Sequence, residues 1–93
     1  MDSNLPTATQ ATVLGRLVAG QYLSRPKGWR TYRVGQLDAL HLSTTQVDVL
    51  AKRGWIVAQS GRSPDEGDTF VATARGATVW HAWRRAQRAA AAA

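Results

Sequence analysis

The hydrophobic residues near the start of the chain recur with the period of a helix. Val13, Leu14 and Leu17 recur at spacings of three and four, so they share one face of a helix. Thr9 is a suitable N-cap for this helix, because a threonine hydroxyl can accept a hydrogen bond from an amide of the first turn. The helix is predicted to end near Leu23, since the proline of the following RPKG connection disfavours helical geometry in the residue before it.

The middle of the chain favours a strand and then a second helix. Residues 28–34, GWRTYRV, are rich in Trp, Thr, Tyr and Val with arginines between them, which is typical of a short strand or an extended arm. In the segment VGQLDAL, Val34, Leu37 and Leu40 lie three apart. This spacing predicts two turns of helix over Val34–Leu40, packed on the first helix.

A further helix is predicted from Ser43 to Arg53. Ser43 and Gln46 have the spacing of a capping box, in which each side chain bonds to the backbone amide of the other residue. The apolar residues that follow fall on one face, and the last turn is basic, as the helix dipole prefers. Gly54 supplies a left-handed C-cap, so the helix should end at Arg53.

Two strand-like runs and a last helix complete the pattern. WIVAQS and DTFVATA are joined by GRSPDEG, which has the composition of a turn, so the three segments predict a small ribbon. Thr73 can cap the last helix, which places Trp80 and Trp83 on one face. The opposite face of this helix carries a basic stripe formed by His81, Arg84, Arg85 and Arg88.

This order of elements resembles the winged helix, a helix-turn-helix variant with a hairpin wing. Thr73, Ala74, Arg75 and Gly76 are similar to the Thr-x-x-Gly-Arg motif that opens the last helix of many bacterial members, with the final Arg missing. The Leu-x-x-Arg-Gly-apolar-Ile/Val motif that ends the third helix is matched by Leu50, Arg53, Gly54, Trp55 and Ile56.

The resemblance implies an α+β, mainly α, fold. A single winged-helix domain would span residues 9–88, with a three-helix core, a two- to three-stranded antiparallel wing and a C-terminal helix. Residues 1–8 are expected to form a disordered lead, and residues 89–93 a frayed Ala-rich tail.

Charge indicates the chemistry of the partner. The chain carries a net charge of +6 and has a pI near 11.2, which favours a polyanion, because Lys and Arg contacts to phosphates release counterions. The excess of Arg over Lys and the abundance of Ala are typical of GC-rich coding, as in actinobacteria and their bacteriophages.

Composition also limits the location of the protein. The absence of cysteine excludes disulfides and thiolate sites. No apolar run approaches the roughly 20 residues that cross a bilayer, and the first residues lack the pattern of a signal peptide. A cytoplasmic protein of a bacterial host cell, with no membrane partner, is therefore expected.

The resemblance and the charge together predict binding to double-stranded DNA, by a small bacterial or phage transcriptional regulator or accessory factor. The helix Ser43–Arg53 would dock toward the major groove. The predicted contacts to bases or phosphates are Thr44, Thr45, Gln46, Lys52 and Arg53, and the residues expected to position the DNA backbone are Arg30, Arg33 and Arg62.

A protein partner is the alternative, because winged helices also serve as protein-binding modules. Asp48 would repel phosphate on the exposed face of the docking helix, and Val49 reads at most a thymine methyl. Asp65, Glu66 and Asp68 weaken the grip of the wing loop on DNA. These features favour a module that binds a host protein, for example a phage-encoded one.

Two aromatic pairs each have two interpretations. Trp29 and Tyr32 stand among the basic residues of RPKGWRTYR, where they would either stack on sugars and bases or belong to the core. Trp80 and Trp83 would either pack over the first helix or form a dimer surface. Terminal helices of winged-helix regulators commonly mediate dimers, so the resemblance favours a homodimer through the last helix.

Catalytic chemistry is not supported by the residue pattern. His41 and His81 lie far apart, with no acid or nucleophile placed to join them. The acidic loop lacks the ligand spacing of a calcium site, and no glycine-rich phosphate loop is present. No enzyme activity, metal or cofactor is therefore expected.

Overall fold

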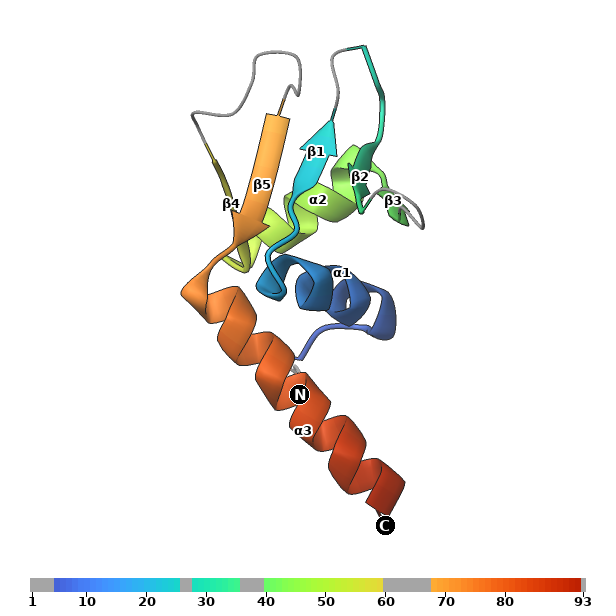
Figure 1. Cartoon of the computed structure of the whole chain (residues 1–93), viewed down its shortest axis with the longest axis vertical. Coiled ribbons are helices and arrows are strands. Elements are labelled where there is room, and N and C mark those ends of the chain that lie inside the picture. The colour runs from blue at the N-terminus through green and yellow to red at the C-terminus, as the bar shows by residue number, and fades with distance from the viewer. Residues whose placement is uncertain (1–4, 26–27, 36–39, 60–67, 93) are drawn as a thin grey trace.

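Three helices and five short strands follow one another in the computed structural model, whose described residues are 5–25, 28–35, 40–59 and 68–92 (Figure 1). The strands form one antiparallel sheet in the order β3-β2-β1-β5-β4, and the N- and C-terminal helices pack against each other. Within these described ranges, no helix is long and apolar enough to cross a membrane. The elements are α1 (Ala8–Val18), β1 (Leu23–Arg25), β2 (Tyr32–Val34), β3 (Leu40–Leu42), α2 (Thr44–Lys52), β4 (Ile56–Ala58), β5 (Asp68–Ala72) and α3 (Ala74–Ala92).

Helix α1 begins and ends earlier than the sequence predicts. Its N-cap is Thr7 and not Thr9, because Thr7 Oγ1 accepts a bond of 3.2 Å from the Gln10 amide while Gln10 Oε1 accepts one of 2.9 Å from the Thr7 amide. The helix ends at Val18, and the predicted end near Leu23 is wrong, since Leu23 opens strand β1.

The predicted helix over Val34–Leu40 is wrong at both of its ends. Val34 is the last residue of β2 and Leu40 the first of β3, and the two residues pair across an antiparallel hairpin. The strands YRV and LHL each alternate apolar and polar side chains, a period that suits a sheet with one buried face. Gly35 follows β2 with a φ of +86°, which is incompatible with continuing a right-handed helix. Leu37 lies outside the described residues.

The predicted three-helix core with a two- to three-stranded wing is therefore wrong, because a three-stranded meander, β1–β3, stands in place of the second helix and belongs to a five-stranded sheet. Strand β1 of this meander pairs with β5, so the sheet continues into the β4–β5 ribbon. The ribbon itself was predicted correctly, and its strands pair in the register Ile56 with Ala72 and Ala58 with Phe70.

The two faces of the sheet differ in polarity. One face packs with α1 and α2 in a single hydrophobic core, and α2 lies behind the strands in Figure 1. The other face carries polar side chains on β3, β2, β1 and the start of β5. The buried core residues are Val13, Leu14, Leu17, Leu23, Tyr32, Val34, Leu42, Val47, Leu50, Trp55 and Ile56.

A single threonine joins the end of α2 to the start of α3. Gly54 terminates α2 with a φ of +77°, as predicted for the C-cap. Thr73 Oγ1 donates a 2.6 Å hydrogen bond to the carbonyl oxygen of Gly54 and accepts one of 3.0 Å from the Gly76 amide. The Thr73 amide donates to the Trp55 carbonyl at 3.0 Å. We refer to these contacts among Gly54, Trp55, Thr73 and Gly76 as the junction.

Gly76 is required by the close approach of α3 to Trp55. The residue is buried, and a Cβ placed on it would overlap the carbonyl oxygen of Trp55. The two sequence motifs of the resemblance are thus in direct contact, because Gly54 and Trp55 belong to one and Thr73 and Gly76 to the other.

Helix α3 packs on α1 only through its first half. Gly15 of α1 allows this contact, since a Cβ there would lie 2.7 Å from Nε1 of Trp80. Residues 84–92 are all exposed, and this half projects away from the sheet (Figure 1). The Ala-rich segment that was expected to fray is helical to Ala92.

Replacing Thr73 tests the junction without changing the shape of its side chain. We expect Thr73→Val to lower the free energy of unfolding by about 2 kcal/mol, because it removes an N-cap and leaves the Gly54 carbonyl without its donor. Thr73→Ser keeps the hydroxyl and should retain most of that stability. Urea denaturation followed by circular dichroism measures both variants, and equal losses would contradict the assignment.

Gly76→Ala tests the close approach of the backbone. We expect a loss of about 3 kcal/mol, which outweighs the roughly 1 kcal/mol by which alanine normally favours a helix. Gly15→Ala is the matched control in α1, and it should cost less, because the Trp80 ring can shift whereas the Trp55 carbonyl cannot. Thermal melts of the two variants decide the order.

Candidate nucleic-acid interface

The exposed face of α2 is polar and nearly neutral. Thr44, Thr45, Asp48 and Lys52 are exposed, as the docking prediction requires, and Val49 is 37% exposed. The opposite face anchors the helix in the core. The helix itself therefore offers hydrogen-bonding groups and one cation, together with a carboxylate and an apolar patch.

Gln46 is already engaged in capping α2. Its Oε1 accepts a 2.9 Å bond from the Ser43 amide, while Ser43 Oγ accepts one of 3.2 Å from the Gln46 amide. This confirms the predicted capping box. A glutamine reads adenine with Oε1 and Nε2 together, so such a contact would have to share Oε1 with the Ser43 amide. The cap thus restricts the orientation in which Gln46 can meet a partner.

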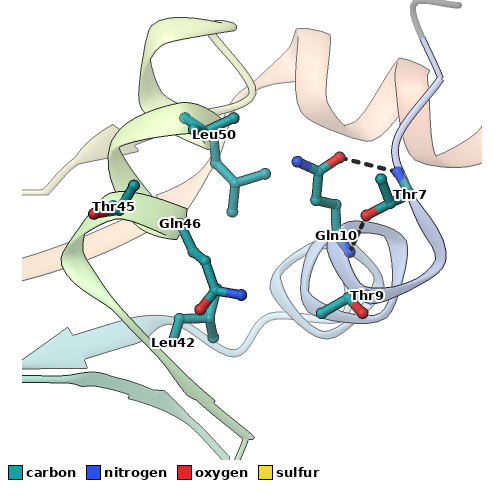
Figure 2. Close-up of a pocket in the computed structure, with 8 residues that line it drawn as sticks. Thr7, Thr9, Gln10, Leu42, Thr45, Gln46 and Leu50 are labelled. Atoms are coloured by element: carbon teal, nitrogen blue, oxygen red, sulfur yellow. Dashed lines mark hydrogen bonds between the residues drawn. The ribbon is translucent and has the colours of Figure 1, made fainter.

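A groove of about 300 Å³ separates the start of α1 from α2 (Figure 2). The side chains of Gln10, Gln46 and Leu50 lie in the space between the two helices (Figure 2). Thr45 also lines it, together with Thr7 of the α1 cap. The groove offers amides and hydroxyls and no charged side chain among its lining residues, so it does not by itself attract a polyanion.

A basic groove of about 530 Å³ lies at the end of α2. Its lining side chains are Lys52, Arg53, Trp55, Arg75 and Val79, so three cations face one hollow with no carboxylate among the lining residues. The guanidinium of Arg53 lies 5.1 Å from the centre of the Trp55 ring, which orients this side chain by a cation–π contact. We call this hollow the junction groove.

Arg75 is the member of the junction groove that the sequence did not identify. It stands in the second motif, where Thr73 and Gly76 drew attention to the fold and Arg75 was given no role. In the structure its side chain lies over Gly54, and its Cδ is 3.6 Å from the position that a Cβ atom on Gly54 would occupy. The antiparallel β4–β5 ribbon returns the chain to the end of α2, and this return is the signal that would have found the residue.

Of the predicted backbone-positioning arginines, Arg33 lies away from α2. Arg33 pairs with Ser24 and His41 on the polar face of the sheet, whereas α2 packs on the opposite face. Arg30 is exposed just before β2. Arg62 lies outside the described residues. The predicted DNA-contacting set is thus divided between two faces of the molecule.

The two aromatic residues of the basic segment have different roles. Tyr32 is buried in the core, with its ring edge-on to Phe70 at 5.6 Å. Trp29 is 45% exposed and lies under the guanidinium of Arg33 at 5.3 Å. The core interpretation therefore holds for Tyr32, and Trp29 remains accessible for stacking.

The side chains of Trp80 and Trp83 pack over α1. Both are half-buried and line a hollow of about 290 Å³ with Gly15 and Arg16 of that helix. Arg84 lies 5.4 Å from the centre of the Trp80 ring. The intramolecular interpretation of the two tryptophans is thus met, while the homodimer stays a prediction.

Most acidic residues of the chain have side chains outside the part that the structure describes. Among residues whose side chains the structure describes, Asp48 is the one carboxylate. Asp65 and Glu66 of the predicted acidic loop lie outside the described residues, and Asp68 is the first residue of β5. The described residues contain no cluster of His, Cys, Asp and Glu that could hold a metal ion.

The sequence matches no protein-family model, and comparisons with curated proteins and with solved structures found no match. The site is therefore interpreted from its own geometry and charge.

Substitution of Gln46 separates capping from binding. We expect Gln46→Ala to lower the free energy of unfolding by about 1 kcal/mol, because the Ser43 amide loses its acceptor. Gln46→Glu keeps an acceptor at this position and adds a favourable charge near the helix N-terminus, so its Tm should match that of the parent chain. A similar drop in Tm for both variants would show that the amide nitrogen, and not the cap, matters for stability.

Proposed function

We propose that the chain is a small double-stranded DNA-binding protein that docks α2 on the duplex and holds the phosphates in the junction groove. The observation that carries the proposal is the meeting of Lys52, Arg53 and Arg75 around one hollow. Three cations that line one groove with no carboxylate among the lining residues repel one another, and a bound phosphate relieves this repulsion.

The position of this groove relative to α2 supports a duplex as the partner. A helix that reads DNA needs backbone contacts beside it to fix its register, and such contacts commonly come from Lys and Arg. The junction groove supplies them at the C-terminal end of α2, while Thr44 and Thr45 stand exposed at the other end. Hydroxyl groups suit either base edges or phosphates.

The proposed fold family is a variant of the winged helix. The helix α2, the ribbon β4–β5 and the opening of α3 follow the order of that family, and the meander β1–β3 replaces its second helix. In this proposal the protein acts as a regulator or accessory factor in a bacterial or bacteriophage setting.

A protein-binding module is the second candidate, and one feature of α2 favours it. Asp48 and Val49 occupy the middle of the exposed face. A carboxylate opposes phosphate there, and an exposed valine suits an apolar partner surface. A host protein with a basic rim around an apolar patch would fit this arrangement.

Salt dependence of binding to random duplex DNA tests the first candidate. The affinity of the parent chain should fall steeply as salt rises, with a slope that counts the neutralised phosphates. Lys52→Ala and Arg75→Ala should each reduce this slope by about 0.9, because each removes one phosphate contact. Fluorescence anisotropy with a labelled duplex measures the slope.

Arg75→Lys is the matched control, since it keeps the charge and should keep the slope. Absence of duplex binding near 50 mM salt, a concentration at which phosphate contacts are strong, would sink the DNA proposal and favour the protein-binding candidate. If binding persists and neither alanine variant changes the slope, the phosphates are held elsewhere than in the junction groove.

A further inference from the structure

The polar face of the sheet carries a continuous row of side chains, one from each of four strands. His41 pairs with Arg33, Arg33 with Ser24, and Ser24 with Thr69. Neighbouring strands lie about 4.8 Å apart, so paired side chains on one face are adjacent. The row crosses β3, β2, β1 and β5 on the side that α1 and α2 leave uncovered. We call it the sheet row.

One end of the sheet row is an exposed aromatic and cationic cluster. Trp29 is 45% exposed, and the guanidinium of Arg33 lies 5.3 Å from the centre of its ring. The His41 ring is nearly parallel to the indole, at 14° and 6.4 Å between centres. Arg30 is exposed beside Trp29 in the chain. The cluster therefore presents planar rings together with positive charge.

The other end of the sheet row is recessed and has an unused hydrogen-bonding group. Ser24 and Thr69 are only 9% and 3% exposed, although they point away from the hydrophobic core. The Thr69 hydroxyl is buried without a hydrogen-bond partner. Burying such a group unpaired costs about 1–3 kcal/mol. The oxygen has no accessible surface, so this end of the row offers no group to a ligand.

We propose that the sheet row, together with Trp29, binds an unpaired segment of a nucleic-acid strand. A base stacks on the indole of Trp29, and Arg33 and Arg30 neutralise the adjacent phosphates. Single-strand binding in proteins combines these elements, namely aromatic platforms for bases and cations for the backbone.

The composition of the surface favours a nucleic acid over an acidic peptide. An acidic peptide needs cations alone, whereas the row combines an exposed indole and a parallel imidazole with its cations. Duplex DNA also fits poorly, because its bases are already stacked and cannot cover Trp29. The sheet row lies on the face opposite α2, so its occupancy does not depend on the junction groove.

The test measures binding of the full chain to labelled oligothymidine and oligouridine of about 16 nucleotides, a length within the known site sizes of single-strand binders. We expect binding at low salt with quenching of tryptophan fluorescence. Trp29→Ala should weaken it about tenfold or more, as loss of one stacked base does, while duplex affinity changes less than about twofold. The DNA and RNA oligonucleotides distinguish the two sources of the strand.

Thr69→Val is a control within the sheet row. This variant keeps the shape and removes the orphan hydroxyl, so the fold should be at least as stable in thermal melts. Its affinity for oligothymidine should equal that of the parent chain, because the hydroxyl has no accessible surface. A loss as large as that of Trp29→Ala would contradict the assignment of the binding to the exposed end of the row.

Two further results would overturn the whole proposal. One is a parent chain that binds no oligothymidine at low salt, and the other is competition by polyglutamate as effective as that by oligothymidine, which would identify an acidic protein partner. Lys52→Ala is the matched control on the other face and should weaken duplex binding alone. Single-strand binding without duplex binding would reject the proposed function and leave the sheet row standing.

Discussion

The hydroxyl of Thr73 is the contact on which the arrangement of the molecule depends. It bonds both to Gly54, the residue that terminates α2, and to Gly76 in the first turn of α3. The Trp55 carbonyl closes the same contact from the other side, where only a glycine fits. With both ends held, the direction of α3 is determined, and its first half can lie along α1 with the Trp80 ring against Gly15.

The same contact has a chemical consequence, because it brings Arg75 to the side of Lys52 and Arg53. Cations that are far apart in the sequence become neighbours only when the ribbon folds back and the junction closes. Stability and charge are thus coupled in one small region: residues that hold the helices together are interleaved with those that face the solvent. Three cations and no carboxylate line the groove that results.

The sequence was informative where its signals were local. The helix-capping signals act within one turn of chain: the box of Ser43 with Gln46, the left-handed Gly54, and the cap Thr73. The helices that these signals delimit were predicted correctly. The prediction of a helix from Val34 to Leu40 failed, because three apolar residues spaced by three are compatible with both a short helix and the ends of two strands. Only cross-strand pairing distinguishes them, and pairing is not a local property.

The same limit applies to the candidate sites. The roles of Trp29 and Tyr32 could not be separated from the sequence, because they depend on which face of β2 meets the core. Arg75 was overlooked for a related reason, since its partners lie on another element.

The order of the strands has a further, kinetic meaning. The β1–β5 pairing, which sets Leu23 beside Phe70, is the described seam between strands remote in sequence. Closing so long a loop is entropically unfavourable until many contacts form together, so we expect the two halves of the sheet to gain structure before the seam between them closes.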